Sequence, residues 1–369
     1  MQNFLRTNLC FLLALLMITG FPLAAYAQGD MRYFSGSDYN DVSSEVPNAV
    51  ITLEGEHGTI SDPTLGTSGN PVLITRKGVY RITGSGENVS ILVNDEKESG
   101  NIYLILDRVS MKNEEACIRV EGADAVIIQC VGDNTLISTA PEKGTIFSRD
   151  DLTINGSGSL TIESGNNGIH CNDDLRITGA EISVRAINDG VKANDGIYMD
   201  GGSLTVSLSY EGLEAGAIVI QGGEISVTAG DDGINVSAEN GDVIISGGSI
   251  YINSGGDGID SNHSILVEGG VILMEGPENS RNSLFDKGDN ADAVLSISGG
   301  TVLAAGSSAK AKNFDTGSQC SVLMEVKGQP GDTISVDDGS GISLTAGKSF
   351  TCILYSSPTF TSDNTVNIS

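Results

Sequence analysis

The chain has 369 residues, including 48 glycines and no tryptophan, and its 48 acidic and 20 basic residues give a formal net charge of -28 at pH 7. A charge of this sign argues against nucleic acids or anionic membranes as partners, because both require a basic surface. The length fits two ordinary domains or one elongated repeat domain.

The first 27 residues have the pattern of a signal peptide. Arg6 gives a weakly positive start, residues 9–21 form an apolar run of the expected length, and residues 25–27 fit a small-x-small cleavage site. The apolar run is too short for a transmembrane anchor. We therefore expect an exported protein, secreted or at the cell surface, with no membrane span. Residues 28–48 are expected to be an N-terminal linker.

Residues 49–317 contain a repeat that predicts a parallel β-helix. A glycine before a branched aliphatic residue, the marker glycine, recurs every 21 to 25 residues, at Gly144, Gly168, Gly190, Gly212, Gly233 and Gly258. Periods of this length are typical of solenoids. Each repeat carries three apolar pairs with a spacing of two, such as Val191/Ala193, Ile197/Met199 and Leu204/Val206. This alternation indicates three half-buried strands in about 22 residues, and hence an all-β, single-stranded parallel β-helix with one repeat per turn.

A glycine pair travels with the marker glycine in each repeat. These pairs are Gly201-Gly202, Gly222-Gly223, Gly247-Gly248, Gly269-Gly270 and Gly299-Gly300. The chain must bend sharply between strands, and glycine reaches positive φ without steric cost. We expect this freedom to explain both sets of glycines.

Both ends of the repeat are less regular. Strand-like segments from about Val50 predict earlier turns and an N-terminal cap, and residues 318–369 predict a β-rich closing segment. Nothing in the sequence indicates an oligomer, so we expect a monomer.

Five cysteines follow the predicted signal peptide, and their odd number leaves at least one unpaired. Cys117–Cys130 and Cys320–Cys352 are candidate disulfides. No pair of cysteines has the spacing of a zinc site.

Stacked turns would bring acidic residues into columns. The residue before each marker glycine gives Asn167, Asp189, Glu211, Asp232 and Asp257, and the second residue after it gives His170, Lys192, Glu214, Asn235 and Asp260. Two carboxylates about 5 Å apart repel by about 0.8 kcal/mol in water and about 3 kcal/mol at an effective dielectric constant of 20. A calcium ion between turns would offset this repulsion, because it binds six to eight oxygen ligands.

The candidate metal ligands are Asp189, Asp195, Glu211, Asp231, Asp232 and Asp257. Lys192 lies in the same region and would neutralise part of the column. The alternative is that aspartate and asparagine serve only as turn residues, with no ion between them. Both interpretations stay open at this point.

Four short motifs resemble those of a known family. "NDGV" at residues 188–191, "YEGLEA" at 210–215, "DDGI" at 231–234 and the longer "GGEISVTAGDDGI" at 222–234 are similar to turns of bacterial secreted carbohydrate-binding domain-containing proteins. The resemblance covers residues 49 to 358. It implies a right-handed parallel β-helix with a pectate-lyase-like fold and calcium-dependent binding of plant cell-wall polysaccharides, polygalacturonate above all and cellulose as another candidate. Calcium positions carried over by motif are Asp189, Glu211, Asp231 and Asp232.

The sequence favours a binding protein over an enzyme. A polysaccharide lyase, the second candidate, commonly needs a basic residue to remove a proton, but Arg176 and Arg185 fall at outward strand positions typical of surface charges. His57, His170 and His263 lie far apart in sequence, and no nucleophile motif occurs. A structural adhesin is the third candidate. The carbohydrate-binding residues are not identified by the sequence.

Overall fold

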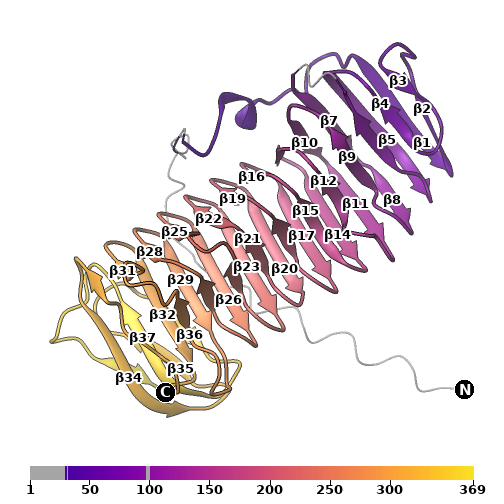
Figure 1. Ribbon diagram of the computed structural model, residues 1–369. Coiled ribbons are helices and arrows are strands. Elements are labelled where there is room, and N and C mark those ends of the chain that lie inside the picture. The colour runs from indigo at the N-terminus through magenta and orange to yellow at the C-terminus, as the bar shows by residue number, and fades with distance from the viewer. Residues whose placement is uncertain (1–29, 31, 97–99) are drawn as a thin grey trace, which may run out of the picture.

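The computed structural model describes residues 30, 32–96 and 100–369. The predicted signal peptide lies outside these residues. The described chain is a long parallel β-solenoid with one short 3-10 helix, η1 (Gly36–Tyr39), and the turns follow one another from the N-terminal to the C-terminal end (Figure 1). The predicted all-β fold and parallel β-helix are confirmed. Within the described residues, no helix has both the length and the apolar character needed to cross a membrane.

Each regular turn contributes one strand to each of three stacks, which we call stacks 1, 2 and 3 in the order of the chain. Stack 1 consists of β4 (Val72–Ile74), β6 (Ile91–Asn94), β9 (Ile118–Gly122), β12 (Gly144–Ser148), β15 (Asn167–Cys171), β18 (Val191–Ala193), β21 (Leu213–Ala215), β24 (Ile234–Val236), β27 (Ile259–Ser261) and β30 (Phe285–Lys287). Stack 2 consists of β7 (Ile102–Asp107), β10 (Val126–Val131), β13 (Leu152–Gly156), β16 (Leu175–Ile177), β19 (Gly196–Met199), β22 (Ala217–Ile220), β25 (Val243–Ile245), β28 (Ile265–Val267), β31 (Leu295–Ile297) and β33 (Thr316–Gly317). Stack 3 consists of β8 (Ser110–Asn113), β11 (Asp133–Ser138), β14 (Ser159–Ser164), β17 (Glu181–Ala186), β20 (Ser203–Leu208), β23 (Glu224–Ala229), β26 (Ser249–Ser254), β29 (Val271–Glu275) and β32 (Thr301–Gly306).

The core is built from columns of aliphatic side chains that point into the solenoid. Val191 on β18 pairs in register with Leu213 on β21, which pairs with Ile234 on β24, and each of these side chains is at most 1% exposed. Parallel pairing places each strand one turn above its counterpart, about 4.8 Å away. The alternation seen in the sequence is therefore the inward and outward alternation of this core.

The two sets of glycines serve different purposes. The second glycine of each pair has positive φ, as at Gly202 (φ 75°), and a Cβ there would lie 2.4 Å from the carbonyl oxygen of Gly179. The marker glycine does not have positive φ. A Cβ at Gly190 would instead lie 2.5 Å from Cγ1 of Val206 and 2.7 Å from the carbonyl oxygen of Gly212. The expectation of positive φ is wrong for the marker glycines, which are required because neighbouring turns pack too closely for a side chain.

Antiparallel strands cap both ends of the solenoid. At the N-terminal end, β1 (Ala49–Gly55) pairs antiparallel with β2 (His57–Ile60) and parallel with the long β5 (Gly78–Glu87), and β3 (Gly66–Thr67) pairs antiparallel with β4. At the C-terminal end, β37 (Phe350–Ser356) lies between β32 and β34 (Ser321–Gly328). A separate small sheet contains β35 (Thr333–Val336), β36 (Ser343–Thr345) and β38 (Val366–Ile368). These strands build a second core cluster against the outer face of stack 3, around Leu303, Ile353 and Tyr355.

Cysteine pairing does not contribute to this fold. All five cysteines in the described part of the chain, Cys117, Cys130, Cys171, Cys320 and Cys352, are free. The candidate disulfides are therefore absent. Burial raises the pKa of the Cys117 thiol to about 11, as expected for a structural cysteine rather than a reactive one.

The segment before β1 packs along the outer face of stack 2, with contacts to β10, β13, β16 and β19 (Figure 1). We call residues 32–43 the strap. Tyr33 stacks on Tyr198 with ring centroids 5.2 Å apart, and Tyr39 donates a hydrogen bond of 2.7 Å to Asp200. Buried Asp38 accepts a 2.5 Å hydrogen bond from the hydroxyl of Thr153. The region expected to be a linker is thus held to four successive turns by specific contacts.

Replacing Asp38 with alanine is expected to loosen the strap. The change leaves the buried Thr153 hydroxyl without its acceptor, which costs about 1–3 kcal/mol. Hydrogen exchange should then speed up in residues 32–43 while the β-helix core stays protected. Glu45→Ala is the matched control, because Glu45 is exposed in the same segment. Equal exchange in both variants would contradict the role given to Asp38.

Candidate functional site

The outward positions of stack 1 form one continuous row. Strand pairing aligns Leu92, Arg119, Phe147, His170, Lys192, Glu214, Asn235, Asp260 and Asp286. The row begins with apolar and basic side chains and ends with acidic ones. Because this face of stack 1 carries basic side chains at one end and acidic ones at the other, it is the strongest candidate for a functional surface.

The first acidic cluster lies in the middle of this face and consists of Asp189, Glu211 and Glu214. One carboxylate oxygen from each lies within 4.8 Å of the others. Lys192 contacts Glu214, and its Nζ lies 3.5 Å from Oδ2 of Asp189. Burial, followed by the neighbouring Glu214, raises the pKa of Asp189 to about 7. The lysine neutralises part of this cluster, as the sequence suggested.

The second acidic cluster, Asp232, Asp257 and Asp260, lies one to three turns further on. Its carboxylate oxygens also approach within 4.8 Å of one another. Among the described residues, no basic side chain lies within 4.0 Å of these carboxylates. Burial raises the pKa of Asp232 to about 7 and that of Asp260 to about 6. Asp232 Oδ1 accepts a 2.6 Å hydrogen bond from the backbone N–H of Asp257, so the turns themselves hold the carboxylate in place.

Gly256 leaves space beside the second cluster. A Cβ at this position would lie 2.3 Å from Oδ1 of Asp232 and 2.4 Å from Oδ1 of Asp231. A side chain here would therefore fill the space that the carboxylates approach. Together with the oxygen donors and the absence of a close ion pair among the described residues, this geometry fits a hard divalent cation.

The structure brings four of the six predicted metal ligands into the clusters: Asp189 and Glu211 in the first, and Asp232 and Asp257 in the second. Asp195 is exposed at the turn after β18, near Asp173 and Asp174. Asp231 lies next to Asp232, but its carboxylate faces the hydroxyl of Tyr210. Neither of these two is part of a cluster.

Glu214 and Asp260 complete the clusters, although the sequence did not single them out. Both stand in the column two residues after the marker glycine. The signal that could have identified them is that this column and the one before the glycine lie on neighbouring positions of the same face. An acidic residue in both columns within one or two turns marks each cluster.

Two of the basic residues considered for the lyase alternative, Arg176 and His263, form ion pairs. Arg176 forms ion pairs with Asp151 (2.8 Å) and Asp174 (2.7 Å), and its Nε donates to the backbone carbonyl of Tyr33 in the strap. His263 pairs with Asp242 at 2.6 Å. His170 lies in the outward row, where burial lowers its pKa to about 4 and so keeps it neutral.

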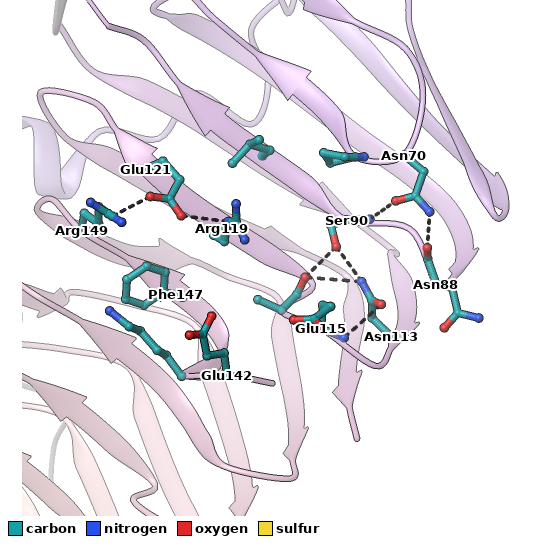
Figure 2. A pocket seen from close by; sticks show the side chains of 15 residues that line it. Asn70, Asn88, Ser90, Asn113, Glu115, Arg119, Glu121, Glu142, Phe147 and Arg149 are labelled. Carbon is teal, nitrogen blue, oxygen red and sulfur yellow. Dashed lines mark hydrogen bonds and ion pairs between the residues drawn. The ribbon is translucent and has the colours of Figure 1, made fainter. Parts of the chain in front are cut away.

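A hollow of about 530 Å³ opens at the N-terminal end of the same face (Figure 2). We call it the N-terminal hollow. Its walls include Asn88, Asn113, Arg119, Phe147 and Arg149. Glu121 lies between the two arginines, 2.9 Å from Nε of Arg119 and 2.5 Å from Nε of Arg149. The repeat pattern gives no sign of this hollow, since most of its residues come from the irregular turns before the marker glycine Gly144.

Comparison with known proteins agrees with the sequence motifs. The family model described as "Carbohydrate-binding domain-containing protein" matches residues 68–235 and 211–339. A carbohydrate-binding domain-containing protein of Acetivibrio thermocellus is 34% identical over 168 residues, which cover 41% of this chain and 56% of that protein. The chain thus spans about half the length of this relative.

Among solved structures, a polysaccharide lyase-like protein from C. thermocellum, determined as a gadolinium derivative, is 28% identical to this chain. The match covers 67% of this chain and 98% of that protein, with a TM-score of 0.49. The family model alone covers well over half of the chain, and the resemblance seen in the turn motifs is confirmed. This chain belongs to the family of carbohydrate-binding domain-containing proteins.

Proposed function

We propose that this protein is exported, has no catalytic activity, and binds acidic plant cell-wall polysaccharide such as polygalacturonate in a calcium-dependent manner. The observation that carries the proposal is the pair of three-carboxylate clusters on the outward face of stack 1. Family membership supports carbohydrate as the partner. Arg176 forms ion pairs with Asp151 and Asp174, so it does not have the free position that the base of a lyase needs. This supports binding rather than elimination chemistry.

The second cluster is the stronger calcium site in this proposal. Asp232, Asp257 and Asp260 bring three carboxylates together, and among the described residues none of them forms an ion pair within 4.0 Å. Calcium takes oxygen ligands at 2.3–2.6 Å, so one ion can reach carboxylates whose oxygens lie within 4.8 Å of one another. Once bound, the ion supplies open coordination positions for the carboxylate of a uronic acid.

The first cluster is expected to bind calcium more weakly. Lys192 already lies against Glu214 and near Asp189, and so places a positive charge where an ion would sit. Affinity for calcium rises with the number of charged ligands and falls when a cation competes for them. The lysine therefore makes the two clusters unequal.

Bound calcium would also weaken the electrostatic repulsion between this acidic protein and an acidic glycan. A protein of net charge -28 repels a polyanion in solution, because the field of the whole protein acts on an approaching ligand. Calcium at the clusters would lower this repulsion, from three negative charges to one at the second cluster and to none at the first with Lys192 included. Neutral glycans such as cellulose would gain nothing from this change.

Retention on immobilised polygalacturonate tests the proposal. Retention is expected with calcium and should fall at least about tenfold in EDTA, because the chelator removes the ion that bridges protein and uronate carboxylates. Cellulose serves as the neutral comparison. The same samples should give no rise in ultraviolet absorbance from unsaturated sugar products. Retention that ignores the chelator would refute calcium dependence, and a rise in absorbance would favour the lyase.

A further inference from the structure

The N-terminal hollow differs in charge from the rest of the protein. Three basic residues, Arg119, Lys143 and Arg149, line it together with three acidic ones, Glu115, Glu121 and Glu142. The hollow is thus balanced in charge within a chain of net charge -28. Its volume, about 530 Å³, falls in the range usual for small-molecule sites.

The two arginines retain donors for a ligand. Each guanidinium group carries five N–H donors, and the ion pairs with Glu121 use Nε of both side chains. The Arg119 side chain is 49% exposed and that of Arg149 is 56% exposed, whereas that of Glu121 is 24% exposed. Glu121 therefore holds the two guanidinium groups from a position between them (Figure 2), while about half of each arginine side chain stays exposed. One carboxylate between two guanidinium groups also leaves a net positive charge.

The opposite wall presents amide and hydroxyl groups in a fixed arrangement. Asn113 donates a 2.6 Å hydrogen bond to the hydroxyl of Ser90, which in turn donates to the carbonyl oxygen of Ala116. The amide of Asn70 donates to the backbone carbonyl of Asn88, whose own side chain is exposed. Polar groups held in this way suit the hydroxyl groups of a sugar.

The floor between these walls is apolar. Leu92 and Phe147 occupy outward positions of stack 1 on either side of Arg119. Phe147 is only 4% exposed, and the ammonium group of Lys143 lies 4.4 Å from its ring centroid. This cation–π contact holds a third positive charge at the edge of the hollow.

We propose that the N-terminal hollow is a calcium-independent subsite that binds the carboxylate of a uronic acid residue through Arg119 and Arg149. The wall around Asn88, whose side chain is exposed, faces the hydroxyl groups of the adjoining sugar. The inference rests on the proposed function and adds a second anchor on the same face. An acidic chain that spans the hollow and the calcium clusters is held at both, and linked weak sites gain affinity together.

Short ligands separate this subsite from the calcium clusters. Trigalacturonate is titrated into the full mature chain in EDTA and followed by ligand-detected NMR, with galactotriose as the neutral probe and inorganic sulfate as the competing free anion. We expect binding of trigalacturonate and not of galactotriose. Because charge-assisted hydrogen bonds are the strong ones, R119Q and R149Q should each weaken binding at least about tenfold.

Arg185→Gln is the matched control, because it removes the same charge from an exposed position on β17, in stack 3. Its binding should equal that of the unmodified protein. Equal affinity for galactotriose, sulfate binding as strong as trigalacturonate binding, or unchanged affinity in R119Q and R149Q would each overturn the proposal. Melting temperatures confirm that all variants are folded.

Different results would contradict the two proposals. If the N-terminal hollow does not bind uronate, trigalacturonate does not bind in EDTA, whether or not calcium restores retention on the polymer. If binding of the polymer does not depend on calcium, retention is the same with and without EDTA, while R119Q and R149Q still bind trigalacturonate more weakly. A variant with Asp232→Asn and Asp257→Asn should keep its affinity for trigalacturonate in EDTA, since those residues lie outside the hollow.

Discussion

Replacing Asp232 and Asp257 together with asparagine should lower the affinity of the protein for calcium at least about a hundredfold, because ligand charge governs the strength of such sites. Both carboxylates belong to the cluster that forms no ion pair within 4.0 Å among the described residues. The amides keep the size and the carbonyl oxygen of the native side chains but remove two of three charges. Isothermal titration with calcium measures the change, and retention on polygalacturonate should fall with it.

Two matched variants show whether the position or only the charge matters. Asp195→Asn removes one carboxylate from an exposed turn outside both clusters, so calcium affinity should stay as it was. Asp189→Asn combined with Glu211→Gln removes two charges from the cluster that contains Lys192, and should cost less than the change at Asp232 and Asp257. If Asp195→Asn is as harmful as the double change, the effect is one of net charge and the proposed site is wrong.

The columns themselves could be predicted from sequence, because a parallel β-helix converts a period into a spatial register. The register holds even where the repeat is uneven. Ile234 pairs with Ile259 across a step of 25 residues, since the extra residues are taken up in the turn between β24 and β25. Strand pairing thus fixes which backbone positions are neighbours, and the sequence is enough to find them.

The reach of each side chain could not be predicted in the same way. A column defines the position of Cα, but a cluster forms only where side chains from two columns turn toward one point. Glu214 reaches the carboxylates before the marker glycine, whereas Asp195 stays in solvent. The strap was also beyond prediction, because contacts such as Tyr39 to Asp200 join single residues 161 positions apart and leave no periodic pattern.

Metal-free protein should become less stable as the pH rises from about 4 to about 7. Folding raises the pKa of Asp189 and of Asp232 from 3.8 to about 7, so the folded protein holds protons that the unfolded chain has lost in this range. The free energy of unfolding then falls with rising pH, by roughly 2 to 4 kcal/mol for each of these groups, and levels off above pH 7. Melting temperatures in EDTA measure this decline.

Calcium should reverse the decline, because its binding requires the same carboxylates to be ionised. Near pH 4 the ion competes with bound protons and should not change the melting temperature, whereas above pH 7 it should raise it by mass action. Calcium binding should also release protons at pH 6 but not at pH 8.5, which titrations in buffers of different ionisation enthalpy detect. Asp232→Asn removes one titrating group, so its melting temperature in EDTA should depend less on pH. A calcium response of equal size at pH 4 and pH 8 would mean that the ion binds away from these carboxylates, and the acidic columns would then serve only the turns that carry them.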